Sequence, residues 1–582
     1  MFEGKVNGCF FTGRFDSGNL YSVEQHQLDY SHKHYSDHAE YDFLSNSDRF
    51  YSLCTRPDAL GSGNESSNRS WFHFCIKNDT QSSLNVCINI TNLNKHNKLY
   101  QQGMRPVIRN SGSIFVPNSE LNENFYESGW KRLRSTSFAY GTLEDHGFCI
   151  SFPLSLPKNE YFYLAFCYPF SYKSSIDLIE MVSSICKKEE IFLDTFTLCQ
   201  SYENRDVNLM VLTSNDAEPV YSEAPEKASN FTPKAAEALR LDFPDKKILV
   251  VTARVHPGET PGQLSFSGFL KFVLSDDARA KILLRNFVIY CIPILNPDGV
   301  YQGNYRTDVL GFNLNRYYLE PDPIKHPQCL ALTNLMDHLT NRRSVNDVFF
   351  MDMHAHAAKR GMFLFGNNLP LHATQITNVF YAKLAEQNSL FFDFEASNFT
   401  QKNMQHVDKR DGCSRDGCSR VAFFKLFGIT HCYTLESNYN SGRWPSRRLQ
   451  PLTDSKVKQS WLPELQESLS TGSPSGAYLD ERYWLEIGGS LMVSVLDLYQ
   501  LLPNSVSRLV NRSKLLEITE KGLPTYVRQN DAKRVQKTVK KNLKNDVQLR
   551  PKNSFTVKPK TLPKRPVFKR ETIKVFLNRL LN

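Results

Sequence analysis

A chain of 582 residues, 41% of them hydrophobic, is too long for one core, because domains usually run to about 100–200 residues. The net charge is +10, but residues 506–582 hold 21 Lys or Arg against 5 Asp or Glu, so a basic tail follows a mildly acidic body. No run of about 18 apolar residues exists, which excludes a membrane-spanning helix, and we expect no signal peptide at the start. Thirteen cysteines, mostly inside apolar runs, indicate buried, reduced thiols of a cytosolic protein.

Residues 1–185 are expected to form an N-terminal antiparallel β-sandwich domain. Apolar residues alternate with other side chains at 72–77 and again at 86–90, which is the period of a half-buried strand. Stretches rich in Asn and Ser divide these runs into short strands. A helical pattern begins near Ser174.

Residues 186–505 are expected to form a second, α/β domain. A continuous apolar run predicts a buried strand at 248–255, as in a sheet covered on both faces, and further buried strands are predicted at 287–295, 348–354 and 429–435. Helices are predicted at 261–274, 328–340, 373–387 and 483–501. Strands that alternate with helices indicate a layered α/β fold. Lys, Arg, Pro and Asn dominate from residue 506, so we predict that 506–582 is a basic, largely disordered tail.

The sharpest local signal is His256-Pro-Gly-Glu259, directly after the first of these strands. A catalytic zinc ion needs three protein ligands and one open position, and a His and a Glu at a strand end can both point at one ion. His354 and His356 end another buried strand, at the edge where ligands of open α/β sheets collect. Both face the same side, so the sequence does not choose between them. Glu436 closes a further apolar run, where a carboxylate is either solvated or held for use.

These elements resemble a known motif set when they are taken in order. His256-x-x-Glu259, Asn296-Pro-Asp-Gly299, Asn315-Arg316, His354 and Glu436 are similar to the ordered motifs of the M14 zinc carboxypeptidases. Residues 11–20, 92–100 and 165–172 resemble the N-terminal β-domain of the cytosolic carboxypeptidases, and residues 356–361 and 433–440 resemble their catalytic domain. The resemblance covers residues 8–502. It implies that the β-sandwich is followed in the chain by an M14 carboxypeptidase-like mixed sheet with flanking helices.

The resemblance also implies the metal site and the catalytic base. It makes His256, Glu259 and His354 the ligands of one Zn²⁺ ion, with His356 as a neighbour. Glu436 would take a proton from the attacking water and pass it to the leaving amine. No tyrosine occurs between Tyr381 and Tyr433, where digestive relatives place a mobile one. Proton donation would therefore rest on Glu436 alone.

Three further residues receive roles from the same resemblance. Arg306 would stabilise the tetrahedral oxyanion, although a surface arginine in a loop is the alternative. Asn315 and Arg316 would clamp the terminal α-carboxylate, for which a guanidinium fork is suited. Because a chain end presents a carboxylate at that distance from the scissile bond, this clamp implies an exopeptidase.

A group of cations is available to receive the side chain of a terminal glutamate. Arg420 is the first choice, because it lies near the specificity position of the family, but a solvated basic loop is the alternative. The sequence Asp-Gly-Cys-Ser-Arg occurs at 411–415 and again at 416–420, so Arg415 competes for the same match. The other candidates are Lys425 and Arg360, together with Lys359, Lys409 and Arg410.

The resemblance implies a cytoplasmic enzyme that removes C-terminal or branch-point glutamate from polyglutamylated proteins, with tubulin or microtubules as the partner. An M14-related deacylase of small acyl-amino acids is one alternative, although a large N-terminal β-domain argues against it. A non-catalytic microtubule-binding module is another, and the intact motif residues argue against that. The basic tail suits any polyanion. We expect the tail to bind an acidic microtubule surface rather than nucleic acid or a membrane. Residues 564–570 also resemble a nuclear-import patch.

Overall fold

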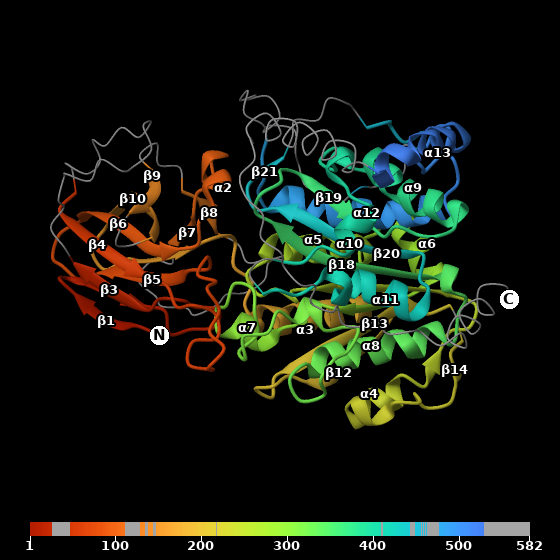
Figure 1. Ribbon diagram of the computed structural model, residues 1–582, viewed down its shortest axis with the longest axis horizontal. Coiled ribbons are helices and arrows are strands. Elements are labelled where there is room, and N and C mark those ends of the chain that lie inside the picture. The colour runs from red at the N-terminus through yellow and green to blue at the C-terminus, as the bar shows by residue number, and fades with distance from the viewer. Residues whose placement is uncertain are drawn as a thin grey trace, which may run out of the picture. The chain divides into compact units, whose positions relative to one another are not determined.

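The computed structural model describes residues 1–25, 47–110, 129–133, 138–143, 147–216, 218–408, 411–442, 449–454, 457, 459, 461–462 and 477–528. Residues Met1–Val527 belong to one compact unit. This unit contains two N-terminal β-sheets and a larger mixed sheet that lies between helices (Figure 1). The α/β class with a preceding β-sandwich, expected from the sequence, is confirmed.

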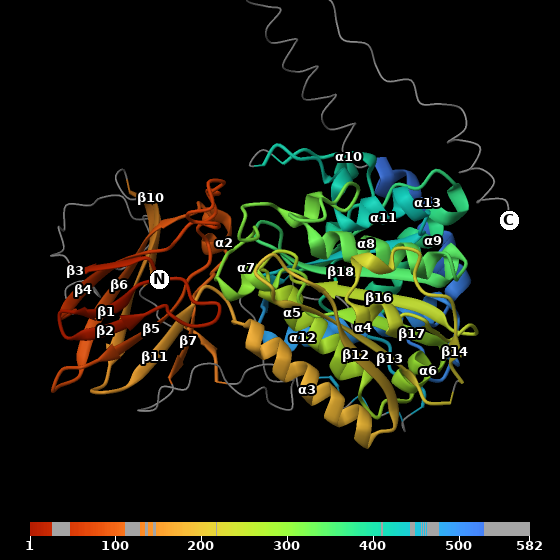
Figure 2. The same cartoon turned by 90° about the horizontal axis from the view of Figure 1, so that it is seen from below.

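The two N-terminal sheets lie as two layers (Figure 2). The first runs through β1 (Glu3–Val6), β2 (Cys9–Thr12), β5 (His73–Asn78), β11 (Tyr161–Ala165), β7 (Val107–Asn110) and β8 (Lys131–Arg132). The second runs through β3 (Ser22–Gln25), β4 (Arg49–Cys54), β6 (Leu84–Leu93), β10 (Gly147–Leu156) and β9 (Ala139–Leu143). Neighbouring strands are antiparallel except β4 and β6, which are parallel. Side chains meet between the layers: the ring centroids of Phe11 and Tyr51 are 5.0 Å apart.

A long helix, α3 (Tyr172–Lys188), follows the sandwich, at the place where the sequence predicts helical periodicity. Its first turn is stabilised by a capping box, because the Ser171 side chain accepts a hydrogen bond from the backbone of Ser174 and the Ser174 side chain accepts one in return. Leu178, Val182 and Cys186 form its buried face. The helix leads into the first strand of the large sheet.

The large sheet has seven strands of mixed direction. In spatial order they are β12 (Ile191–Gln200), β13 (Asp206–Ser214), β17 (Phe287–Ile292), β16 (Lys247–Ala253), β18 (Val348–His356), β20 (His431–Asn438) and β19 (Met362–Phe365). The four central strands, β17, β16, β18 and β20, are parallel, and the outer strands pair antiparallel. These four are the buried strands predicted from the sequence.

Helices cover both faces of this sheet, which is why the central strands are apolar on both sides. Leu249 and Val251 of β16 join the core on one face, and Ile248 and Val250 join the core on the other. The first face carries α5 (Thr260–Val273), α6 (Ala278–Asn286), α9 (His372–Asn388) and α12 (Glu481–Leu498). The second face carries α4 (Pro233–Ala238), α8 (Pro327–Thr340) and α11 (Ser419–Phe427).

Two glycines let α5 and α12 approach each other closely. A Cβ atom on Gly268 of α5 would lie 2.0 Å from the carbonyl oxygen of Leu485, and one on Gly488 of α12 would lie 1.9 Å from that of Ser265. No larger residue fits at either position without separating the helices. The pair therefore fixes α5, whose N-terminus carries part of the functional site.

The predicted tail needs one correction. Residues Arg512–Arg528 form helix α13, and residues 512–527 of it belong to the compact unit, so the described structure continues well past residue 506. The helix is held because Leu523 is buried, Tyr526 stacks edge-on against Phe394, and the Arg512 guanidinium donates to the Asp497 carbonyl oxygen at 2.6 Å. The remainder of the predicted tail, 529–582, lies outside the described residues.

Short elements complete the unit. They are α2 (Asn97–Gln101), α7 (Pro297–Tyr301), α10 (Gln401–Met404), β14 (Val220–Tyr221), β15 (Leu241–Asp242), β21 (Ser441–Gly442) and β22 (Ala477–Tyr478). Among the described residues, none of the helices combines the length and the apolar composition needed to cross a membrane. All thirteen cysteines are free thiols, and eleven of them are buried.

Candidate metal centre and active site

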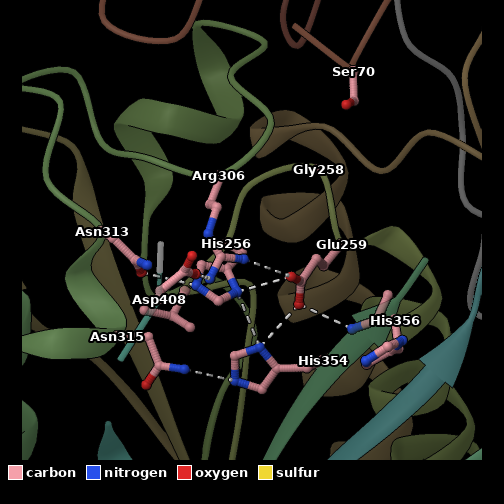
Figure 3. A network of polar contacts seen from close by, with 12 residues as sticks. Ser70, His256, Gly258, Glu259, Arg306, Asn313, Asn315, His354, His356 and Asp408 are labelled. Atoms are coloured by element: carbon pink, nitrogen blue, oxygen red, sulfur yellow. Dashed lines mark hydrogen bonds and ion pairs between the residues drawn. The ribbon is translucent and has the colours of Figure 1, made fainter. Parts of the chain in front are cut away.

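The candidate metal centre begins where β16 ends. Arg254 adopts a positive φ of 59°, and the chain then turns through His256 and Gly258 into helix α5. Glu259 occupies the N-cap position of α5, but its side chain makes no capping hydrogen bond. It is therefore available to point away from the helix toward His256, as Figure 3 shows.

The neighbouring strand β18 supplies the third candidate ligand. His354 lies near its C-terminal end, beside the end of β16, because the two strands run parallel. Nδ1 of His256 is 2.9 Å from Oε1 of Glu259, and Nδ1 of His354 is 2.9 Å from Oε2. The two Nδ1 atoms are 3.2 Å apart. The three side chains are buried, and they are the group among the described residues whose geometry could hold a metal ion.

The chemistry of this donor set fits zinc. Two imidazoles and one carboxylate are ligands that Zn²⁺ takes in catalytic sites, where a fourth position stays open. Burial lowers the pKa of His256 to about 4, which keeps its ring neutral and able to bind a metal. Burial alone would raise the pKa of Glu259, but the charges and hydrogen bonds of His256 and His354 hold it well below its usual value.

The outer nitrogens of both imidazoles are occupied by other side chains. Nε2 of His354 lies 2.9 Å from Oδ2 of Asp352, and Nε2 of His256 lies 3.0 Å from Oδ1 of Asn313. Such partners fix the ring orientation and leave Nδ1 for the metal. Burial opposes the charged form of His354, but Asp352 and Glu259 outweigh it and raise the pKa of His354 well above its usual value.

Sequence reasoning missed both of these partners, although Asp352 carried a usable signal. It lies two residues before His354 and therefore on the same side of strand β18. Its carboxylate also accepts hydrogen bonds from the hydroxyls of Thr252 at 2.9 Å and Ser419 at 2.8 Å. A fully buried aspartate in an apolar strand is explained by these three contacts.

The structure distinguishes the roles of His354 and His356, which the sequence left open. Nδ1 of His356 accepts hydrogen bonds from the backbone N–H groups of Ala358 and Lys359 at 3.1 and 3.0 Å. His356 lines the cavity but does not belong to the ligand group. The turn that follows β18 thus holds His356 aside from the ligand atoms.

Glu436 lies across from the ligand group on strand β20. It is the register partner of His354 on β18 and lines the same cavity. Burial raises the pKa of Glu436 to about 7, and the nearby Glu259 also raises it, while His354, Arg415 and Arg306 oppose the rise. A carboxyl group with this pKa can both take and give up a proton near neutral pH.

Two arginines from the segment after α7 line the same cavity, and Figure 3 shows that Arg306 faces the ligand group. Nη1 of Arg306 is 3.8 Å from Oε1 of Glu259, and its Nη2 is 3.4 Å from Oδ2 of Asp408. Arg316 shares that aspartate, with its Nη2 3.6 Å from the same oxygen. Asn315, the residue before Arg316, contacts the ligand group, with Nδ2 3.4 Å from Nε2 of His354. Asp408 is a further residue that the sequence did not reveal.

Arg420 is buried in the wall of the cavity. Its guanidinium donates to the carbonyl oxygen of Gly366, to Oδ1 of Asn367 at 2.7 Å and to Oδ1 of Asn403 at 3.0 Å. All of these acceptors are neutral, and no described carboxylate pairs with Arg420. Burial lowers the pKa of Arg420, which reflects the cost of holding this charge without a counter-ion.

The structure does not bring every predicted cation into the cavity. Lys425 lies on α11 and pairs with Asp416 at 3.0 Å, and neither Lys425 nor Arg360 lines the cavity. Arg415, the competing match, does line it. Lys409 and Arg410 lie outside the described residues.

The cavity has a volume of about 520 Å³, and the β-sandwich forms part of its wall. Lys95 and Lys98, beside and within α2, are exposed cations on that wall, and no described carboxylate pairs with either. No pattern in the sequence indicates this contribution, because it depends on how the β-sandwich packs against the α/β part of the compact unit. Tyr305 is the tyrosine among the described lining residues.

Comparisons with known proteins agree with this arrangement. Residues 179–337 match the zinc carboxypeptidase (Peptidase M14) family model. The chain is 32% identical over 543 residues to cytosolic carboxypeptidase-like protein 5 of Bos taurus, covering 76% of this chain and 59% of that protein. It is 28% identical over 442 residues to cytosolic carboxypeptidase 6 of Mus musculus, covering 75% and 68%. A metallo-carboxypeptidase crystal structure from Burkholderia cenocepacia has a TM-score of 0.54 at 16% identity, covering 84% and 99%.

Over residues 179–337 the chain thus matches the zinc carboxypeptidase domain of the M14 family. Over three quarters of its length it is similar to the cytosolic carboxypeptidases, which confirms the resemblance found in the sequence. It spans about 59% of the length of the bovine relative. The family implies zinc as the cofactor, and His256, Glu259 and His354 are the residues that fit it.

Proposed function

We propose that this protein is a zinc-dependent metallocarboxypeptidase that removes C-terminal or branch-point glutamate from polyglutamylated proteins. The observation that carries the proposal is the joining, in one cavity, of a His-Glu-His ligand group, a buried carboxyl and several arginines. The names of the relatives support a cytosolic carboxypeptidase. Tubulin is the substrate that we expect from the resemblance, and its acidic tails would bring the enzyme to microtubules.

The proposed reaction divides the work among the cavity residues. When bound, zinc polarises the scissile carbonyl and lowers the pKa of the attacking water. Glu436 takes the proton from that water and delivers it to the leaving amine. The guanidinium of Arg306, close to Glu259, stabilises the negative charge that develops on the carbonyl oxygen.

Recognition of the chain end falls to Asn315 and Arg316. Nη1 of Arg316 donates to the backbone carbonyl oxygen of Asn315 at 2.7 Å, so the two residues act as one unit. The Arg316 side chain is 5% exposed, which makes a carboxylate bound to it largely desolvated and the contact strong. An internal peptide bond offers no carboxylate at this place, which favours an exopeptidase.

Cations elsewhere in the cavity support an acidic substrate. Arg420 holds a buried charge whose described partners are neutral, so a glutamate side chain would supply the missing counter-charge. Lys95 and Lys98 on the β-sandwich side would attract further acidic residues upstream of the terminal one. This distribution of charge favours glutamate chains over apolar termini.

The test is incubation of the zinc-loaded protein with polyglutamylated brain tubulin, followed by mass spectrometry of the tubulin tails. We expect stepwise loss of single glutamates, abolished by a chelator and restored by zinc. Glu436→Gln protein is the matched control. Intact tails combined with hydrolysis of small acyl-amino acids would replace this proposal with a deacylase.

A further inference from the structure

The loop that carries Arg306 is held by the β-sandwich along its length. It leaves α7 at Tyr301 and reaches Leu310, and backbone groups at both ends bond to the sandwich. Ser17 donates its N–H to Tyr301 O at 3.0 Å, Asn19 donates to Gly303 O at 3.0 Å, Arg56 donates to Gln302 O, and Asn64 donates to Leu310 O at 3.3 Å.

Asp58 is the central contact of this group. Its carboxylate accepts three consecutive backbone N–H groups: Oδ1 from Tyr305 at 2.7 Å, and Oδ2 from Arg306 at 2.7 Å and from Thr307 at 3.0 Å. Asp58 is 1% exposed. Its own backbone is fixed by hydrogen bonds to Asn68 and Ser66. Hydrogen bonds to an ionised acceptor are roughly twice as strong as neutral ones, so this contact firmly fixes the loop.

The same loop also touches the metal centre. The N–H of Gly258, between two of the ligands, donates to the carbonyl oxygen of Tyr305 at 2.8 Å. A Cβ atom on Gly258 would lie 2.6 Å from the Tyr305 ring, so the turn and the loop are in close contact. Tyr305 is therefore held between Asp58 on one side and the His256–Glu259 turn on the other.

We propose that Asp58 is a positioning residue for catalysis: by binding the backbone of residues 305–307, it sets where the Arg306 guanidinium lies relative to the metal ligands. The proposal rests on the function proposed above for Arg306. It makes the β-sandwich a structural part of the active site, although none of its residues reacts.

The first test is Asp58→Asn, assayed on a glutamate-terminated peptide at pH 7.5. The amide presents one acceptor oxygen and an NH₂ group that faces N–H donors, so at least one loop contact is lost. We expect kcat to fall on the order of 10- to 100-fold, as for a misplacement of about 1 Å, with KM and zinc content nearly unchanged. Asp16→Asn is the matched control. Asp16 is also a sandwich carboxylate that accepts two backbone N–H groups, but they come from Tyr172 and Lys173 at the start of α3 and not from the loop.

A double-mutant cycle with Arg306→Ala separates positioning from general stability. If Asp58 acts through Arg306, Asp58→Asn lowers kcat much less in the Arg306→Ala background than in the wild type. An equal fold-loss in both backgrounds, or a wild-type kcat in Asp58→Asn, would overturn the proposal. If Asp58→Asn does not fold, Asp58→Ser takes its place in the double-mutant cycle, because serine keeps an acceptor oxygen and adds no amide group.

Hydrogen exchange gives a readout that does not depend on activity. In Asp58→Asn, or in Asp58→Ser if that is the variant recovered, the amides in a peptide covering 303–310 should exchange at least 10-fold faster, and in Asp16→Asn they should not. Unchanged protection would overturn the proposal. A wild type that releases no glutamate, together with loss of protection in the Asp58 variant, would instead count against the proposed enzyme while leaving the loop contact established.

Discussion

At the scale of single residues, Glu436 shows how burial and neighbouring charges raise the pKa of a carboxyl group. It sits between β18 and β19 in the sheet, facing a cavity that contains another carboxylate. Burial and the charge of Glu259 both disfavour its ionised form. The nearby cations oppose this, so its pKa of about 7 is a balance set by its neighbours rather than by its own chemistry.

Glu436→Gln should keep the fold and the zinc but lose turnover. The amide is nearly isosteric, so packing against β18 is retained, but it cannot accept a proton. We expect kcat to fall about 10²–10⁴-fold, the usual contribution of a general base. Atomic absorption measures whether the variant keeps its zinc, and an assay on a glutamate peptide measures the loss of kcat. Turnover near that of the wild type would remove Glu436 from the mechanism.

The pH dependence follows from the same residue. The base must be ionised, and its raised pKa means that it protonates as the pH falls through about 7. Bound zinc adds positive charge and pulls this value down, so we expect the acidic limb of kcat/KM at or below pH 7. Activity should rise with pH through this limb and then level off. A profile that falls between pH 6 and 7 would contradict this assignment.

Arg420→Ala should change specificity more than it changes general activity. Loss of one partner from a buried charge pair costs about 2–5 kcal/mol, so kcat/KM for terminal glutamate should fall at least 30-fold. For terminal leucine the loss should be small. Lys425→Ala is the matched control, because Lys425 lies on the same helix outside the cavity and pairs with Asp416. Equal losses for both substrates would indicate a folding defect instead.

At the scale of elements, strand β18 places a ligand and its supporting carboxylate on one side. Asp352→Asn keeps the shape but removes the charge that orients His354. We expect zinc affinity to fall about 10- to 100-fold, as is usual for such partners. Competition with a chelating dye measures it. Asp347→Asn, at the residue directly before the same strand and paired with Lys247, should bind zinc like the wild type. Unchanged zinc affinity in Asp352→Asn would show that Asp352 does not support His354.

The contact between α5 and α12 gives a prediction about stability. Gly488→Ala puts a methyl group 1.9 Å from the carbonyl oxygen of Ser265, so the helices must move apart. Overpacking of this kind costs about 1–3 kcal/mol of unfolding free energy. Thermal unfolding should show a lower Tm, while Gly4→Ala, whose methyl would meet Phe2 at an ordinary 3.5 Å, should not. An unchanged Tm in Gly488→Ala would mean that the contact between α5 and α12 accommodates a methyl group.

Strands could be predicted from the sequence where both faces of the sheet are covered by helices. Phe287–Ile292 is apolar throughout, and Val348–His356 is apolar up to Met351, because helices cover both faces, and that pattern survives in the sequence. The outer strand β12 is half-buried and less distinctive, and strand direction leaves no local trace at all. Helix α13 was missed because its polar composition resembles that of the tail, whereas a few apolar residues such as Leu523 decide its packing.

At the scale of the whole molecule, the site is assembled from segments far apart in the chain. The candidate ligands could be predicted because they lie at the ends of recognisable strands and match the ordered motifs of the M14 carboxypeptidases, whereas the strand pattern alone left His354 and His356 as alternatives. Lys95, Asp58 and Asp408 could not, because their neighbours at the site lie hundreds of residues away in sequence or on irregular loops. Only tertiary packing brings the β-sandwich to the cavity. Charge and backbone contacts from that sandwich therefore had no sequence signature.

The last prediction concerns the basic segment beyond α13. Residues 529–582 contain 16 Lys or Arg and 3 Asp or Glu, and we propose that this charge tethers the enzyme to acidic microtubule surfaces. A chain ending at residue 528 keeps α13, so its activity on short glutamate peptides should equal that of the full chain. Its turnover on intact microtubules should be lower at low salt, and the difference should shrink as salt rises, because exposed charges are screened beyond about 8–10 Å.

A full-length chain in which these 16 cations are replaced by Gln separates charge from length and should behave like the truncated one. A chain ending at residue 505 should in addition have a lower Tm, because it lacks the buried Leu523 and the bond from Arg512 to the end of α12. Rates on microtubules that are the same for the full, truncated and neutralised chains at low salt would rule out the tether. A loss in the truncated chain alone would assign the effect to length, since only charge distinguishes the other two.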